Sequence, residues 1–110
     1  MEARFLINDF CVKHGIPWVH TGVRGGRGEV MPVVPGETPC FECVFHGTRG
    51  EPGTCDSESI EPEAAEKVAE TAVEEAWRIL EGEGRGGLVR IRNGRRRRLE
   101  VGERSGCSAC

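Results

Sequence analysis

The chain has 110 residues, the length of one small domain, and only 37% of them are hydrophobic. Globular proteins usually contain about 45–50% apolar residues, so the core is small for this length. No apolar run is long enough to cross a bilayer and no basic-then-apolar leader opens the sequence, so we expect a cytoplasmic protein with no membrane partner. The net charge of −3 combines an acidic block between Asp56 and Glu83 with an arginine-rich block between Arg85 and Arg104. Adjacent blocks of opposite sign are most simply explained as surfaces that offset each other within one fold.

The first third of the chain predicts a helix followed by two strands. Residues 1–13 carry a broad apolar face that is typical of a packed helix. Residues 16–23 and 29–34 are short and apolar, which suits buried strands. The glycines between Gly22 and Gly28 predict a turn that joins them. Since this segment opens no helix, a plain turn is favoured over a phosphate-binding loop.

The clearest helix spans residues 62–81 and follows an exposed loop, 45–60, that carries Cys55. Pro62 suits the first helical turn, and Gly82 ends the helix. Apolar residues recur there at three- and four-residue steps, which predicts a face that packs on a sheet. The members of this face are Ala65, Val68, Ala69, Ala72, Val73, Ala76, Trp77 and Leu80.

Residues 88–92 and 95–101 predict a β-hairpin, because the Asn93-Gly94 pair between them is a strong turn signal. The run Arg95–Arg98 in the second strand has two interpretations. A solvated strand that faces the acidic helix is favoured over a surface for nucleic acid or another acidic partner. No aromatic residue that could stack on bases is interleaved with the arginines, which argues against nucleic acid.

Two Cys-x-x-Cys pairs, Cys40 with Cys43 and Cys107 with Cys110, are the strongest chemical signal in the sequence. Zn²⁺ prefers four tetrahedral thiolate or imidazole ligands, and a two-residue gap lets a tight turn direct both sulfurs of a pair to one point. We therefore predict a structural zinc that clamps residues 40–43 to residues 107–110 within a single domain, 1–110. Two disulfides or idle thiols remain the alternative, which a cytosolic location disfavours because thiols stay reduced there.

Several motifs together resemble the ThiF/MoeB/HesA family, whose members activate ubiquitin-like and sulfur-carrier proteins. They are Arg4-Phe5-Leu6-Ile7-Asn8, Gly15-Ile16-Pro17, Gly22, Gly28, and the Pro35-Gly36-Glu37-Thr38-Pro39 segment before the first cysteine pair. The alanine-rich helix, the glycine-led hairpin and the final cysteine pair also follow the family's order. The resemblance implies an α/β fold, with a partial Rossmann-like, ThiF-type sheet, two helices and a zinc-clamped C-terminal β-hairpin.

The resemblance implies ATP-dependent adenylation of a carrier protein that ends in Gly-Gly, with an acyl-adenylate and pyrophosphate as products. Cys55 is the candidate for a subsequent transfer, because the family often carries a thiol on this loop and a thiolate attacks an acyl-adenylate readily. The adjacent carboxylates of Asp56 and Glu58 disfavour that thiolate, so an idle or redox-sensitive thiol stays open. Arg4 and Asn8 match the family's first helix here, and we expect them to brace the site without performing a chemical step.

The family's nucleotide-binding apparatus would lie upstream of the first helix, so we expect that half to be absent. ATP and Mg²⁺ would then bind only if a partner chain supplied the nucleotide-binding half. The family resemblance also implies a homodimer. Three functions follow. The favoured one is the C-terminal half of an activating enzyme, inactive without its nucleotide-binding half. The others are a non-catalytic zinc module that binds a ubiquitin-like protein, and a zinc ribbon that binds nucleic acid through Arg95–Arg98.

Overall fold

The computed structural model describes residues 2–48, 59–103, 107 and 109. The elements are α1 (Glu2–His14), β1 (Trp18–Arg24), β2 (Arg27–Val33), α2 (Phe41–Phe45), the 3-10 helix η1 (His46–Thr48), α3 (Pro62–Leu80), β3 (Leu88–Arg92) and β4 (Arg95–Leu99). The α/β fold class is confirmed, and every predicted helix and strand is present with small shifts at its ends. The short helix α2 was not expected. Of the helices in this described part, none combines the length and hydropathy that a membrane crossing requires.

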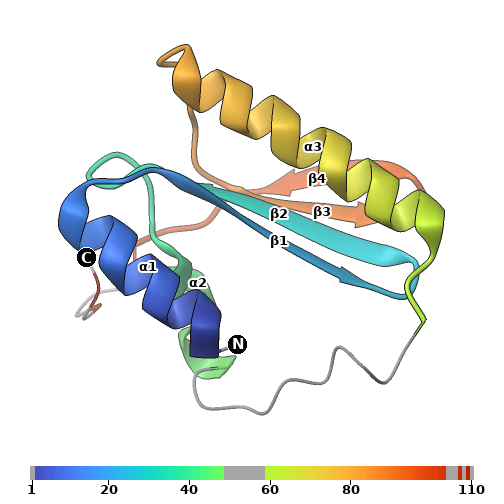
Figure 1. Ribbon diagram of the computed structural model, residues 1–110, viewed down its shortest axis with the longest axis horizontal. Helices are drawn as coiled ribbons and strands as arrows, with labels where there is room; N and C mark the ends of the chain where they lie inside the picture. Colours follow the sequence, from blue (N-terminus) through green and yellow to red (C-terminus); the bar gives the residue numbers. More distant parts are fainter. Residues whose placement is uncertain (1, 49–58, 104–106, 108, 110) are drawn as a thin grey trace.

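The four strands form one antiparallel sheet in the order β1-β2-β3-β4 (Figure 1). Two local hairpins, β1–β2 and β3–β4, are joined side by side where Val30 lies opposite Val89. Asn93 and Gly94 have φ values of 52° and 75°, the left-handed conformation that the predicted two-residue turn requires. Arg27 lies opposite Arg92, so both hairpin turns are at the same end of the sheet.

The two faces of the sheet carry different helices, with α3 on one side and α1 and α2 on the other (Figure 1). Val30 and Val89 pack with Val68 of α3. Their chain neighbours Met31 and Leu88 pack in a second cluster with the cysteine-bearing segment around α2. This division follows from strand geometry, since successive side chains point to opposite faces.

Helix α3 packs closely against the sheet at Gly28. A Cβ atom added at Gly28 would lie 2.2 Å from Cγ2 of Val68. Gly22 and Gly28 both lie within strands, and the turn itself consists of Gly25 and Gly26. The predicted glycine turn between the two strands is therefore present, and it is shorter than expected because β2 begins at Arg27 instead of residue 29. The glycine at position 28 allows close packing of the helix on the sheet.

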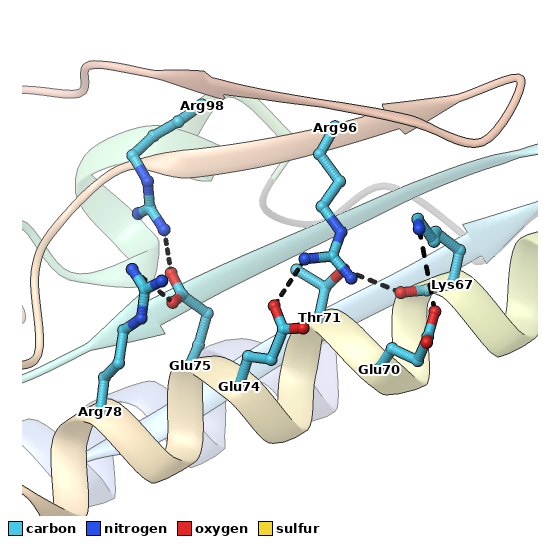
Figure 2. A network of polar contacts seen from close by, with 8 residues as sticks. All are labelled: Lys67, Glu70, Thr71, Glu74, Glu75, Arg78, Arg96 and Arg98. Carbon is cyan, nitrogen blue, oxygen red and sulfur yellow. Dashed lines mark hydrogen bonds and ion pairs between the residues drawn. The ribbon is translucent and has the colours of Figure 1, made fainter.

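The arginine-rich strand β4 faces the acidic helix α3, as predicted, through two of its side chains (Figure 2). Arg96 Nη1 lies 2.5 Å from Glu74 Oε2 on the surface. Arg98 pairs with the buried carboxylate of Glu75 and also donates a 3.1 Å hydrogen bond to the carbonyl oxygen of Gly86. The opposite charge blocks therefore offset each other across the β4–α3 contact.

The predicted packing face of α3 is wrong for three of its largest members. Val73, Trp77 and Leu80 are 67%, 61% and 79% exposed. The buried positions are Ala64, Val68, Thr71 and Glu75. Two of them are polar and can be buried because they are paired: Thr71 Oγ1 donates to the Lys67 carbonyl at 2.8 Å, and Glu75 pairs with Arg98.

The first helix also exposes apolar residues that we expected on its packed face. Leu6, Ile7 and Phe10 are 66%, 47% and 58% exposed. Phe5 is fully buried on the same helix, and its ring packs edge-on against Phe41 at a centroid distance of 5.1 Å. The contacts of α1 are therefore made by one narrow side of the helix, which faces α2.

Candidate metal centre

Cys40 and Cys43 lie at the start of α2, where one helical turn brings them together. Cys40 is the residue before the helix, and the Cys43 backbone N–H donates to the Cys40 carbonyl at 3.1 Å. The preceding loop is closed by Thr38, whose Oγ1 accepts a 2.9 Å hydrogen bond from the backbone N–H of Val34. Gly36, with φ of 83°, allows the chain to reverse within that loop. The Pro-Gly-x-Thr-Pro lead-in thus sets the direction from which the cysteines enter the site.

Helix α1 supports this segment and the neighbouring strand β1 through one side-chain hydrogen bond to the backbone of each. The side-chain oxygen of Asn8, fully buried, accepts a 3.0 Å bond from the backbone N–H of Phe41. Arg4 Nη2 donates to the carbonyl oxygen of Thr21 in β1 at 3.3 Å. Arg4 and Asn8 therefore brace β1 and α2, respectively. Their expected place at the floor of the active site stays a prediction.

The sulfur atoms of Cys40, Cys43 and Cys107 gather at one point. Sγ of Cys40 lies 3.7 Å from Sγ of Cys43 and 3.6 Å from Sγ of Cys107, and all three sulfurs are within 4.8 Å of one another. A disulfide requires an S–S distance of about 2.05 Å, so neither of these two separations is that of a disulfide. Four thiolates around Zn²⁺, with Zn–S bonds of about 2.3 Å, stand about 3.8 Å apart at the edges of the tetrahedron. The donor set and its spacing fit a zinc ion.

The thiol cluster lies in the apolar layer between α2 and the sheet. Cys40 is 1% exposed, while Cys43 and Cys107 are half-buried. Met31 and Leu88 of the central strands pack in the same cluster. Within residues 2–48, 59–103, 107 and 109, these three cysteines form the one group of three or more His, Cys, Asp or Glu side chains spaced for a metal. The cluster ties the segment after β2 to residue 107, beyond the last strand.

Two predicted site residues cannot be placed. Cys110, the fourth predicted zinc ligand, lies outside the described residues, and so does Cys55, the predicted transfer thiol. Their roles stay predictions. The remaining described thiol, Cys11, is buried on α1 and is not part of the sulfur cluster.

A buried histidine beside α2 was missed in the sequence. His20 is 2% exposed, and its Nε2 lies 2.7 Å from Oε2 of Glu29 on the neighbouring strand. Its ring lies 4.7 Å from Phe41 and 5.3 Å from Phe45, between centroids, so it forms part of the aromatic packing under α2. A polar residue within an otherwise apolar strand was the available signal. Its partner could not be identified before the hairpin register was known.

Comparison with known families matches residues 1–108 to the ThiF family. The sulfur carrier protein ThiS adenylyltransferase of Bacillus subtilis is 38% identical over 82 residues, which cover 74% of this chain and 24% of that protein. The SAMP-activating enzyme E1 of Haloferax volcanii is 40% identical over 52 residues, which cover 47% of this chain and 18% of that protein.

Among solved structures, Escherichia coli MccB superimposes with a TM-score of 0.74 at 18% identity, over 97% of this chain and 36% of MccB. MccB crystallised with ATP gives a TM-score of 0.69 at 18% identity. At this identity the likeness shows a shared fold. The chain spans about a quarter of the B. subtilis protein and about a third of MccB.

Proposed function

Because this chain belongs to the ThiF family, we propose that it forms the zinc-bearing part of an enzyme that activates a ubiquitin-like or sulfur-carrier protein with ATP. The observation that carries the proposal is the cluster of Cys40, Cys43 and Cys107 beneath a ThiF-type sheet. The named activities of two relatives, adenylation of the sulfur carrier ThiS and activation of SAMP, support it. The substrate would be a carrier protein that ends in Gly-Gly.

The zinc in this proposal is structural. Cys40, Cys43, Cys107 and Cys110 would hold it, and the reduced cytoplasm would keep the four thiols available. When bound, zinc would cross-link the helix after β2 to the end of the chain. Structural zinc contributes on the order of 10 kcal/mol in small zinc peptides, comparable with the stability of a whole small domain. A small apolar core makes that contribution important here.

The proposed reaction begins with adenylation. The terminal glycine carboxylate of the carrier attacks the α-phosphate of ATP, and pyrophosphate leaves. This step depends on cationic groups and Mg²⁺ that neutralise the phosphates. In the proposal, a nucleotide-binding half supplies them, and the residues of this chain orient the carrier and stabilise the sheet beneath it.

The proposed second step uses Cys55. Its thiol releases a proton to solvent, the thiolate sulfur bonds to the carbonyl carbon of the adenylate, and the bond from that carbon to the AMP oxygen breaks. The products are a thioester and AMP. This step is favourable because thiolates are strong nucleophiles near neutral pH and AMP is a good leaving group.

A chimera tests the proposal. In it, this chain replaces the matching segment of the B. subtilis ThiS adenylyltransferase, which then supplies the nucleotide-binding part. We expect ThiS-dependent ATP–pyrophosphate exchange from the chimera and none from the isolated chain. In the chimera, Cys55→Ala should retain exchange and lose the covalent ThiS adduct.

Two results would contradict this function. A well-folded, zinc-loaded chimera that binds ThiS without nucleotide and catalyses no exchange would support the non-catalytic zinc module. Exchange catalysed by the isolated chain would show that no separate nucleotide-binding half is required.

A further inference from the structure

The arginine run of β4 is divided between two faces of the sheet. Arg96 lies opposite Ile91 and Arg98 opposite Val89, and both apolar partners belong to the core under α3. The alternate residues, Arg95 and Arg97, must therefore point to the opposite face. Figure 2 shows the α3 side, where the carboxylates of the helix meet Arg96 and Arg98.

The opposite face carries a set of arginines that we call the arginine face. Strand pairing places four of them in one row across the sheet, in the order Arg24, Arg27, Arg92 and Arg95. Arg90 and Arg97 form the next row. All six are exposed. Neighbouring strands lie about 4.8 Å apart and the rows about 7 Å apart, so the guanidinium groups extend over a compact area.

Among the residues that the structure describes, few carboxylates neutralise the arginines of this surface other than Arg24, which has a contact of its own. Glu29 shares the second row with Arg90 but is engaged by His20 at 2.7 Å. Glu61 lines an open hollow between the two hairpin turns together with Gly26, Arg27, Arg92 and Asn93. Within the described part of the chain, the following arginines form no ion pair: Arg27, Arg90, Arg92, Arg95 and Arg97.

Protection of the sheet edge does not explain the arginine face. Charged residues on an edge strand prevent edge-to-edge association, which accounts for Arg95 and Arg97 on β4. Arg90 and Arg92, however, lie on β3, and Arg27 lies on β2, both of which are inner strands of the described sheet. Like charges directly opposite each other also destabilise a sheet. The rows of neighbouring arginines therefore reduce the stability of the sheet, and binding of an acidic partner would compensate their positive charge.

We propose that the arginine face docks a carboxylate-rich surface of a partner protein. The whole chain has a net charge of −3 and a pI near 5.7, whereas nucleic-acid-binding domains are usually strongly basic, so a long polyanion would be repelled by the rest of the molecule. The arginine face also has no aromatic residue in either row. A discrete acidic protein patch matches the local charge and avoids that repulsion. This inference does not depend on the metal centre or on adenylation.

The experiment measures binding of two short fluorescent probes, a poly-L-glutamate peptide of a few residues and a single-stranded DNA of matched charge, by anisotropy at low and physiological ionic strength. The test variant is R90E/R92E on the arginine face. The control K13E/R85E changes the net charge equally at exposed positions outside that face. R90K/R92K keeps the charge and loses the guanidinium groups. Circular dichroism and thermal melting confirm that each variant folds.

We expect the test variant to weaken polyglutamate binding by about tenfold, because each exposed pair contributes up to about 1 kcal/mol. The control and the lysine variant should stay within about threefold of the parent. Equal weakening by the test and control variants would overturn the proposal, since binding would then follow net charge alone. Tighter binding of DNA than of polyglutamate, lost in R90E/R92E, would overturn it in favour of a nucleic-acid surface.

Discussion

The side-chain oxygen of Asn8 on α1 accepts a hydrogen bond from the backbone N–H of Phe41 at 3.0 Å, and both residues are fully buried. Phe41 directly follows Cys40, so this bond fixes the first turn of the helix that carries two of the clustered thiols. The position of the thiol cluster thus depends on a residue far from it in sequence. Asn8 is a positioning residue for the candidate metal centre.

Replacing Asn8 with Ala should destabilise the protein and loosen the metal centre. The buried N–H of Phe41 would lose its acceptor, which costs about 1–3 kcal/mol. Chemical denaturation measures the free energy of unfolding, and competition with a coloured chelator measures zinc retention. Lys13→Ala, at an exposed position of the same helix, is the control and should change neither. Unchanged zinc retention in Asn8→Ala would show that α2 holds its cysteines without help from α1.

Replacing Gly28 with Ala should destabilise the contact between α3 and the sheet. The new Cβ would lie 2.2 Å from Val68 Cγ2, so the helix must move or Val68 must change rotamer. Overpacking of this kind costs about 1–3 kcal/mol. Gly102→Ala is the control, since an added Cβ there meets no atom within 4 Å. Equal melting temperatures for the two variants would show that the helix adjusts freely.

The two carboxylates that meet β4 should differ strongly in their contribution to stability. Glu75 is 4% exposed and pairs with Arg98, so Glu75→Gln leaves a half-buried guanidinium without its counter-charge and costs on the order of 3 kcal/mol. The Glu74 side chain is 51% exposed, and Glu74→Gln should cost less than about 1 kcal/mol. Urea denaturation of both variants tests this ranking. A larger loss in Glu74→Gln would contradict the assignment of the buried pair.

Removal of the metal should have the largest effect on stability. If zinc is structural, chelation should unfold the chain or lower its melting temperature sharply, with one zinc released per chain. Cys43→Ser and Cys110→Ser should each reproduce this loss, whereas Cys11→Ser should retain zinc because Cys11 is not in the sulfur cluster. Elemental analysis gives the zinc content of each variant. Full zinc retention in Cys110→Ser would remove Cys110 from the ligand set.

Local signals predicted much of the fold. The Asn93-Gly94 turn, Pro62 at the start of α3 and Gly82 after its end are determined by neighbours in sequence, and the structure has each where it was expected. Cysteine spacing likewise predicted the meeting of Cys40 with Cys107, because a shared metal requires it. These features could be predicted from the sequence because the physical cause of each lies within a few residues or in a single shared ligand.

Features that depend on strand register and side-chain packing could not be predicted from the sequence. The pairing of His20 with Glu29 and the bond from Phe41 to Asn8 require knowledge of which residues become neighbours. The periodicity of α3 suggested that Trp77 packs on the sheet, yet Trp77 is 61% exposed, and the buried side of the helix includes Glu75, which pairs with Arg98 of β4. Amphipathic periodicity reflects only the spacing of apolar residues along the helix, so it cannot predict such a buried ion pair.

The strand order also determines how this chain can fold. Each hairpin closes locally around a two-residue turn, but the pairing of Val30 with Val89 joins halves that are far apart in sequence. Hairpins form in microseconds, whereas long-range pairing must first overcome the entropy of closing a large loop. We therefore expect formation of the β2–β3 seam to limit the folding rate, with the closure entropy of the segment between the hairpins, which includes α3, contributing to that barrier.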